Sequence, residues 1–214
     1  MNNNLAVDIL RNTPALDKNY TKPEKRAKAV VILGSSRTTE PLMEYMDLCA
    51  KTTKDFVNHG YNIVTGCGTK GIMGAAYNAA KEASAVDLSG KPVQNLSIVV
   101  NPLWGDENLQ DCVIIGKAFS ESERIAKFAK VADNFVIFPG GTTTLQEAAT
   151  LIRLNVHSAE NGLKKIVLVG KEFFSGLKTQ YENMANMGFL KKKPEAFFKI
   201  LSQKQEILKE IIRK

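Results

Sequence analysis

The stretch NFVIFPGGTTTLQE, residues 134–147, decides the fold. It opens with an apolar run typical of a buried strand, turns through Pro-Gly-Gly, and continues into a segment with helical spacing of apolar residues. Two glycines and three threonines at a helix start offer free backbone amides, hydroxyls and the positive end of the helix dipole, which suit a phosphate group. Thr144 and Glu147 also have the spacing of a capping box, in which the glutamate only bonds its own helix start, and this segment alone leaves both interpretations open.

The same strand–loop–helix pattern recurs on both sides of this stretch. Strands are expected at 29–34, 61–66, 96–100, 112–115 and 165–169, and helices at 40–59, 71–84, 120–131, 143–154, 172–187 and 195–213. Apolar strands that alternate with helices predict a Rossmann-like α/β fold, a parallel sheet with helices on both faces. We expect a single nucleotide-binding domain over 28–190, preceded by a polar arm at 1–27 and followed by a basic amphipathic helix within 191–214 that packs on the domain.

Composition narrows the class of protein. The chain has 214 residues, of which 44% are hydrophobic and 24% charged, so it can bury a sizeable core. No apolar run approaches the length of a membrane span, and the first residues lack the basic-then-apolar pattern of a secretory signal. Cys49, Cys67 and Cys112 are odd in number and widely spaced, which argues against a disulfide framework or a zinc module. We expect a cytoplasmic protein without membrane contact.

Most of the net charge of +7 lies near the end of the chain. Residues 160–214 contain twelve basic and six acidic side chains. A basic tail can bind nucleic acid, but its lysines at 199, 204 and 209 stand among apolar residues at helical spacing, which favours a solvated helix face. We therefore expect a small-molecule partner and no nucleic acid.

Two further loops follow predicted strands, at the edge of the sheet where α/β proteins bind ligands. Gly34-Ser35-Ser36 offers amides and hydroxyls for a phosphate or ribose oxygen, although an ordinary strand–helix turn explains it equally well. Residues 66–71, GCGTKG, fit the G-x-G-x-x-G spacing of dinucleotide sites, but they follow the second strand rather than the first. This loop either contacts a nucleotide in another way or lets a helix and a strand pack closely.

Arg124 borders the apolar stripe of the predicted helix 120–131. An arginine at the edge of a core needs an anionic partner. The next strand leads to the threonine-rich loop, so a ligand phosphate or Glu147 is a natural partner. The alternative is a surface arginine whose stem covers the core while its guanidinium reaches solvent.

Together these pieces resemble the LOG family of nucleoside 5′-monophosphate phosphoribohydrolases, long described as lysine decarboxylase-like. Residues 139–147 are similar to the family pattern P-G-G-x-G-T-x-x-E, residues 66–74 to its G-G-G-x-x-G-L-M-G, and residues 34–36 to its G-S-S. Arg124 stands nine residues before Asp133, as the family arginine precedes an A-D-x-F motif. The resemblance covers about residues 28–190. The older family name suggests a decarboxylase that uses pyridoxal phosphate, and such an enzyme needs a lysine that typically follows a histidine. Neither His59 nor His157 precedes a lysine, which argues against this activity.

The resemblance implies hydrolysis of the N-glycosidic bond of a nucleoside 5′-monophosphate, such as AMP or a cytokinin ribotide, without a cofactor or metal and in a homodimer or larger assembly. Glu147 would place a carboxylate near C1′, and Arg124 would orient Glu147 and the ribose phosphate or assist the departing base. The residues expected to bind the nucleotide are Gly34, Ser35, Ser36, Gly66, Gly68, Gly71, Gly140, Gly141, Thr142, Thr143 and Thr144.

Three positions depart from the family pattern. Thr143 and Cys67 stand where the family has glycine, and Ile125 stands where lysine usually follows the arginine. A β-carbon at 143 would be strained if the loop required a positive φ there. These departures leave open a non-catalytic nucleotide-binding or carrier protein of the same fold.

Overall fold

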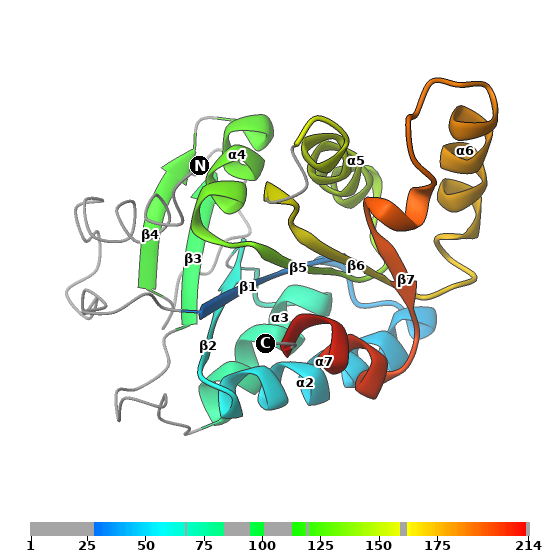
Figure 1. Cartoon of the computed structure of the whole chain (residues 1–214). Helices are drawn as coiled ribbons and strands as arrows, with labels where there is room; N and C mark the ends of the chain where they lie inside the picture. Colours follow the sequence, from blue (N-terminus) through cyan, green and yellow to red (C-terminus); the bar gives the residue numbers. More distant parts are fainter. Residues whose placement is uncertain are drawn as a thin grey trace.

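The computed structural model describes residues 28–66, 68–83, 95–100, 113–118, 120–158 and 162–212. Its strands form one parallel sheet in the order β4-β3-β2-β1-β5-β6-β7, which confirms the predicted α/β architecture (Figure 1). The strands are β1 (Lys28–Leu33), β2 (Tyr61–Thr65), β3 (Asn95–Val100), β4 (Val113–Ala118), β5 (Asn134–Ile137), β6 (Lys165–Val169) and β7 (Lys199–Leu201).

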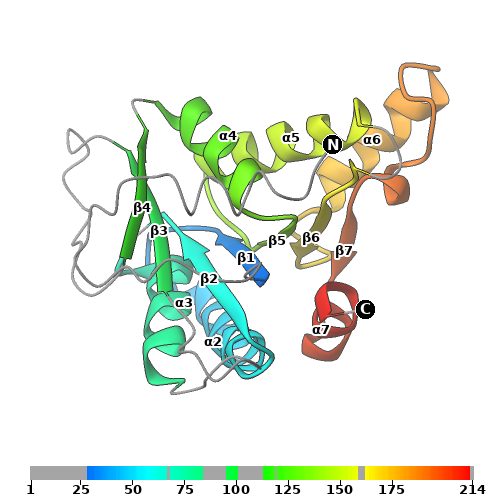
Figure 2. The same cartoon turned by 60° about the vertical axis from the view of Figure 1, so that its left-hand side comes forward.

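Helices cover both faces of this sheet, as predicted. One face carries α2 (Met43–Asn58), α3 (Gly71–Glu82) and α7 (Lys204–Ile212) (Figure 2). The other carries α4 (Glu121–Val131), α5 (Thr142–Val156) and α6 (Ser175–Asn186). Two short 3-10 turns, η1 (Glu40–Leu42) and η4 (Pro194–Ala196), also lie within the described ranges. Within the described ranges, no helix is long and apolar enough to cross a membrane.

Successive side chains of the central strands enter different cores. In β1, Val31 and Leu33 pack with Phe128 of α4, whereas Val30 and Ile32 pack with Phe56 of α2. A strand alternates its side chains between the two faces, so a strand buried on both faces must be apolar at every position. This explains why β1, β5 and β6 appear in the sequence as runs that are apolar after their first residue.

The order of the strands creates a topological switch point between β1 and β5. From β1 the chain moves through α2 to β2 on one side, and from β5 it moves through α5 to β6 on the other. Right-handed crossovers in opposite directions place α2 and α5 on opposite faces of the sheet. The loops after β1 and β5 therefore diverge at the edge where ligands bind in open α/β sheets.

The predicted helix at 195–213 is wrong in its first half. Residues 199–201 form β7, which pairs with β6 through Val167 and Lys199. Phe197 and Phe198 are buried on the α5 side of the sheet, and α7 then begins at Lys204 on the other side. A short apolar run fits a helix and an edge strand equally well by pattern, and pairing with β6 decides between them. The predicted arm at 1–27 lies outside the described residues.

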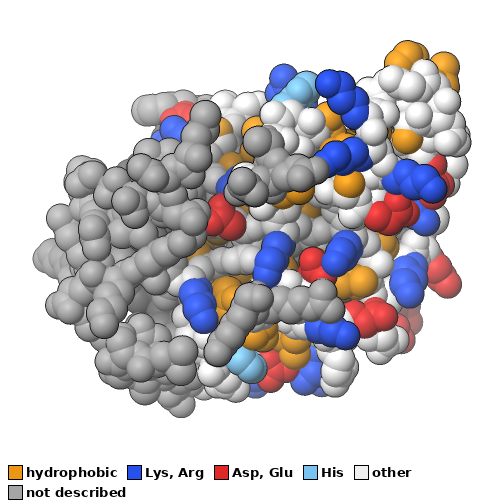
Figure 3. Space-filling view, in the orientation of Figure 1, with side chains coloured by type: hydrophobic (Ala, Val, Ile, Leu, Met, Phe, Trp, Pro, Cys, Tyr) orange, Lys and Arg blue, Asp and Glu red, His pale blue; other side chains and the backbone are white. Residues whose placement is uncertain are grey.

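The basic residues of the tail share their surface with acidic ones. Lys204 pairs with Asp55 of α2 at 2.8 Å, and Lys199 pairs with Glu210. On the face shown in Figure 3, blue and red side chains are interspersed over the described part of the surface. Lys204 and the exposed Lys209 lie on α7, as expected for a solvated helix face, whereas Lys199 lies on the strand β7.

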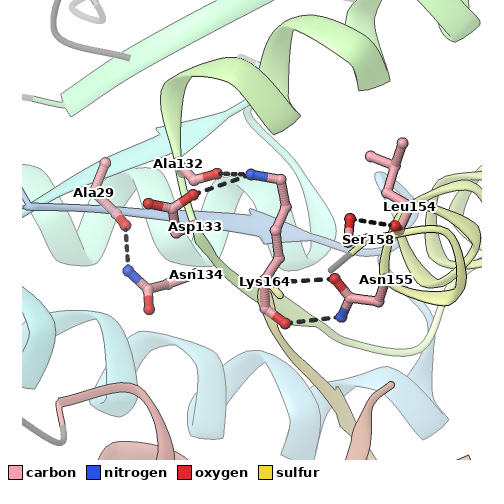
Figure 4. Close-up of polar contacts among 8 residues, drawn as sticks. All are labelled: Ala29, Ala132, Asp133, Asn134, Leu154, Asn155, Ser158 and Lys164. Atoms are coloured by element: carbon pink, nitrogen blue, oxygen red, sulfur yellow. Dashed lines mark hydrogen bonds and ion pairs between the residues drawn. The ribbon is translucent and has the colours of Figure 1, made fainter. Parts of the chain in front are cut away.

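The buried side-chain amide of Asn155 hydrogen-bonds to backbone groups at the amino end of the sheet, opposite the switch point. Asn155, near the end of α5, accepts a hydrogen bond from the Lys164 backbone N–H at 2.9 Å. Its Nδ2 donates to the Lys164 carbonyl at 2.9 Å and to the Phe197 carbonyl at 2.7 Å. The Lys164 ammonium donates to the Ala132 carbonyl and to Asp133 (Figure 4). One side chain thus joins α5, the start of β6 and the turn before β7.

Substituting Asn155→Ala removes these bonds and leaves buried backbone groups unpaired. We expect the free energy of unfolding to fall by about 2–4 kcal/mol, measured by urea denaturation. The control is Ser158→Ala, because Ser158 is exposed and its hydroxyl donates only to Leu154. That change should cost less than about 0.5 kcal/mol. Equal stability of the two variants would contradict the role given to Asn155.

Candidate functional site

The three loops singled out in the sequence meet at the carboxyl ends of β1, β2 and β5. The Ser35 N–H, after β1, donates to the Pro139 carbonyl, after β5, at 3.0 Å. The Ser35 carbonyl accepts from the Ile72 N–H, at the start of α3, at 2.8 Å. Ser35 therefore joins the second glycine loop to the threonine-rich loop through its own backbone.

This contact leaves no room for a side chain at Gly71. Gly71 has a φ of +60°, and a β-carbon there would lie 2.7 Å from the Arg37 carbonyl oxygen and closer still to that of Ser35. Both the left-handed backbone and the close approach require glycine. Gly71 thus lets the start of α3 pack closely against the loop after β1, rather than against a strand as the structural alternative had it.

The start of α5 presents its amide groups at the same place. Gly141 is the N-cap residue and has no side-chain cap, and the Leu145 N–H makes the first intrahelical bond, to the Gly141 carbonyl. The N–H groups of the first helical turn have no partner within the helix, and they carry the positive end of its dipole. Thr142 and Thr143 are exposed here, whereas Thr144 is buried.

Two expectations about this segment are resolved. Thr144 is the third residue of α5 and not its N-cap, so the capping box with Glu147 is not formed. Thr143 is the second residue of a right-handed helix, whose φ is negative, so the strain expected from its β-carbon does not arise. The departure at Thr143 is therefore compatible with the loop.

Arg124 and Glu147 come together, from α4 and α5. Arg124 is 8% exposed and Glu147 is 4% exposed, so the surface position considered for Arg124 is wrong. One Nη2–Oε1 distance between them is 3.7 Å. The same Nη2 donates to Glu121 Oε2 at 2.7 Å, within α4. The arginine thus lies between two carboxylates and is closer to the one on its own helix.

The second glycine loop makes room for this arginine. A β-carbon at Gly66 would lie 2.9 Å from Arg124 Nη1 and 3.3 Å from the Met73 sulfur. Met73 also lies against Gly68. Glycine at 66 therefore lets the guanidinium reach the carboxyl end of β2. Cys67, the second departure, lies outside the described residues.

Burial raises the pKa of Glu147, the positive charge of Arg124 lowers it, and the negative charge of Glu121 raises it, so that the pKa lies at about 7. A carboxyl whose pKa lies near neutrality exchanges its proton readily at physiological pH. This property is typical of an acid or base in a reaction site.

Two residues near the site were not predicted from the sequence. Glu121 carries a signal, because a glutamate three residues before an arginine faces it on a helix. For Met73 the sequence gives only a weak indication, namely that it stands in the first helical turn after the glycine loop. Ile125 is fully buried in the core beneath α4, which explains an apolar side chain at the third departure.

The charged groups of the site do not form a metal centre. Among the described residues, no group of three or more His, Cys, Asp and Glu side chains is arranged to hold a metal ion.

Comparisons with known proteins agree with the fold. A family model described as "Possible lysine decarboxylase" matches residues 68–211. The chain is 25% identical over 177 residues to "Cytokinin riboside 5'-monophosphate phosphoribohydrolase LOG5" of Arabidopsis thaliana, which spans 78% of this chain and 70% of that protein. It is 29% identical over 126 residues to "Cytokinin riboside 5'-monophosphate phosphoribohydrolase LOG" of Oryza sativa subsp. japonica, and the match spans 57% of this chain and 49% of that protein.

Solved structures show the same fold. The molybdenum cofactor binding protein from Rippkaea orientalis superposes with a TM-score of 0.57 at 18% identity, over 89% of this chain and all of that one. The molybdenum cofactor carrier protein from Chlamydomonas reinhardtii superposes with a TM-score of 0.55 at 18% identity, over 88% of this chain and all of that one.

Gly140 and Gly141 provide a matched pair to test the loop contact. A β-carbon at Gly140 would collide with Thr144 Oγ1 and lie 2.9 Å from the Ser35 nitrogen, whereas one at Gly141 meets nothing within 4 Å. We expect Gly140→Ala to lower the free energy of unfolding by about 1–3 kcal/mol, as overpacking does. Gly141→Ala should cost less, about 0.5–1 kcal/mol, because its β-carbon meets no atom and only the poorer N-cap propensity of alanine opposes it. Urea denaturation of both variants measures this, and equal loss in both would contradict the close contact between the loops.

Proposed function

The chain belongs to the family described as possible lysine decarboxylase, and from its buried Arg124–Glu147 pair we propose that it hydrolyses the N-glycosidic bond of a nucleoside 5′-monophosphate. The products are the free base and ribose 5-phosphate. The observation that carries the proposal is a buried carboxyl with a pKa near 7, held 3.7 Å from a guanidinium beside an uncapped helix start. The similarity to curated phosphoribohydrolases supports the same reaction.

The family description raises a different chemistry, decarboxylation with pyridoxal phosphate. That cofactor needs a lysine amine facing it to form a Schiff base. In the described parts of the loops after β1, β2 and β5, the lysine present is Lys70, and its side chain is exposed. The buried charged groups are instead Arg124 and Glu147. The described residues therefore do not fit pyridoxal phosphate, and no step is assigned to it.

The 5′-phosphate would bind at the start of α5. Backbone amides of the first helical turn and the helix dipole favour an anion there. The exposed hydroxyls of Thr142 and Thr143 add donors, and the Ser35 loop lies beside them. Anchored in this way, the ribose would lie toward Glu147, one turn further along the helix.

Hydrolysis breaks the bond between C1′ and the base nitrogen, and the bonding electrons leave with the base, which takes up a proton. Positive charge develops on the ribose ring, and the Glu147 carboxylate would stabilise it electrostatically. Water then forms the new bond to C1′ and loses a proton, which the same carboxylate can accept. Arg124 would orient Glu147 and the ribose phosphate, or assist the departing base.

A second candidate is binding of a phosphorylated nucleotide without cleavage. It is favoured by Ile125, which is fully buried and supplies no charge where the LOG pattern has lysine. Incubation with a panel of nucleoside monophosphates separates the two candidates. Release of free base supports the hydrolase, whereas binding by calorimetry without release supports the carrier. The homodimer and the cytoplasmic location stay predictions from the sequence.

Glu147→Gln should lower kcat/KM by about 10²–10⁴-fold while nucleotide binding stays measurable, because the amide cannot ionise. Burial raises the pKa of Glu147 to about 7, so the carboxylate is populated only as the pH passes this value. The kcat/KM of the wild type should therefore rise with pH up to about 7 and level off above it. Equal activity of the wild type and the variant would refute the assigned role.

The phosphate anchor predicts a strong preference for phosphorylated substrates. We expect AMP to be cleaved with a kcat/KM at least about 10²-fold above that of adenosine, because charge-assisted hydrogen bonds to the phosphate contribute roughly 1.5–3 kcal/mol each. The measurement is adenine release from each compound under the same conditions. Comparable rates on the two would contradict the anchor at the start of α5.

A further inference from the structure

We propose that Glu121 is a positioning residue, which holds the Arg124 guanidinium beside Gly66 and keeps it from closing onto Glu147. This inference rests on the proposed function, since it concerns the same pair of residues. It assigns a task to a side chain that is not part of the motifs resembling the LOG family.

The distances show which carboxylate holds the arginine. Arg124 Nη2 donates to Glu121 at 2.7 Å, the length of a charge-assisted hydrogen bond. The same nitrogen lies 3.7 Å from Glu147, which is too long for a hydrogen bond. A small movement of the guanidinium toward Glu147 would close that gap, and the bond to Glu121 opposes it.

The surroundings limit where the guanidinium can go. Nη1 occupies the space that a β-carbon at Gly66 would need, and the Phe128 ring centroid lies 5.9 Å from the guanidinium carbon. Between the glycine loop and the aromatic ring, the arginine is restrained in direction. A short displacement of the guanidinium would therefore be enough to move it from Glu121 toward Glu147.

A more exposed ion pair on the same helix, Lys127 with Glu123, shows how the Arg124–Glu121 pair differs in burial. Lys127 and Glu123 pair at 2.8 Å, with side chains 33% and 36% exposed. The Arg124 and Glu121 side chains are 10% and 26% exposed. Charges in the less exposed pair are less screened by water and interact more strongly with a third charge nearby. Glu123 therefore provides a matched control for Glu121.

Few other charges face Glu147. The strand side chains packed near α5 are apolar and include Phe135, Ile137 and Leu168. Within the described part of the chain, the charged groups that act on Glu147 are Arg124 and Glu121, both of α4. Loss of the Glu121 charge and closure of Arg124 onto Glu147 would both favour the ionised form of Glu147.

The test compares Glu121→Gln with Glu123→Gln in the full chain without ligand. Carboxyl carbons of glutamate are labelled with ¹³C and titrated by NMR, and the Glu147 signal is assigned by its loss in Glu147→Gln. We expect the pKa of Glu147 to fall by about one unit or more in Glu121→Gln and to stay unchanged in Glu123→Gln. An unchanged pKa in Glu121→Gln, or equal shifts in both variants, would overturn the proposal.

Kinetics provide a second readout. In Glu121→Gln the rising limb of kcat/KM should move to lower pH by the same amount, and kcat on the plateau should fall about tenfold with KM changed less than twofold. Ionisation of the substrate phosphate is common to all variants, so a shift between them reports the protein. A merely structural role would lower thermal stability and leave the limb in place, which would refute positioning.

A second variant at the same position tests the proposal independently of Glu121→Gln. Glu121→Asp keeps the charge but shortens the side chain, so Arg124 is released and the pKa of Glu147 should fall by a smaller amount than in Glu121→Gln. This variant separates release of Arg124 from loss of the Glu121 charge, and it also serves if Glu121→Gln does not fold. An unchanged pKa in Glu121→Asp would refute the proposal. If the wild type cleaves no nucleotide, the proposed function fails, whereas the NMR titration of Glu121→Asp, which keeps the charge, still decides whether Glu121 controls Arg124.

Discussion

Burial of the Glu147 carboxyl between α4 and α5 is the constraint on which the site depends. A carboxylate taken out of water loses hydration, and it can stay ionised only with a nearby positive charge. Arg124 supplies that charge, while its Nη2 donates a hydrogen bond to Glu121 and lies 3.7 Å from Glu147. A close ion pair with Arg124 would lower the pKa of Glu147, and burial without a nearby positive charge would raise it further. The observed arrangement lies between these two cases, and the pKa is about 7.

This arrangement needs the glycine loops as much as the charged residues. Arg124 reaches the carboxyl end of β2 because Gly66 has no β-carbon in its way. The start of α5 comes near the loop after β1 because the Ser35 and Pro139 backbones bond directly. The small residues therefore bring charged groups from two helices to one edge of the sheet, where the strand order changes direction.

Much of the fold could be predicted because burial on both faces makes the central strands apolar throughout. The approach of Arg124 to Glu147 was also predictable, from the position of Arg124 beside an apolar stripe and the loop that follows. Edge strand β7 was not, because three residues of a helical-looking run pair with β6 only once the sheet exists. The capping box failed for a related reason: the helix begins three residues earlier than the pattern of Thr144 and Glu147 implies.

The first turn of α5 belongs to the candidate site, whereas its last turn stabilises the fold. Its first turn faces the loops of the site, whereas Asn155 at its last turn bonds to the backbone that begins β6 and precedes β7. Because the Asn155 bonds lie about a helix length from the first turn, a substitution at the exposed Thr142 or Thr143 can change the ligand that the site binds and leave those bonds intact.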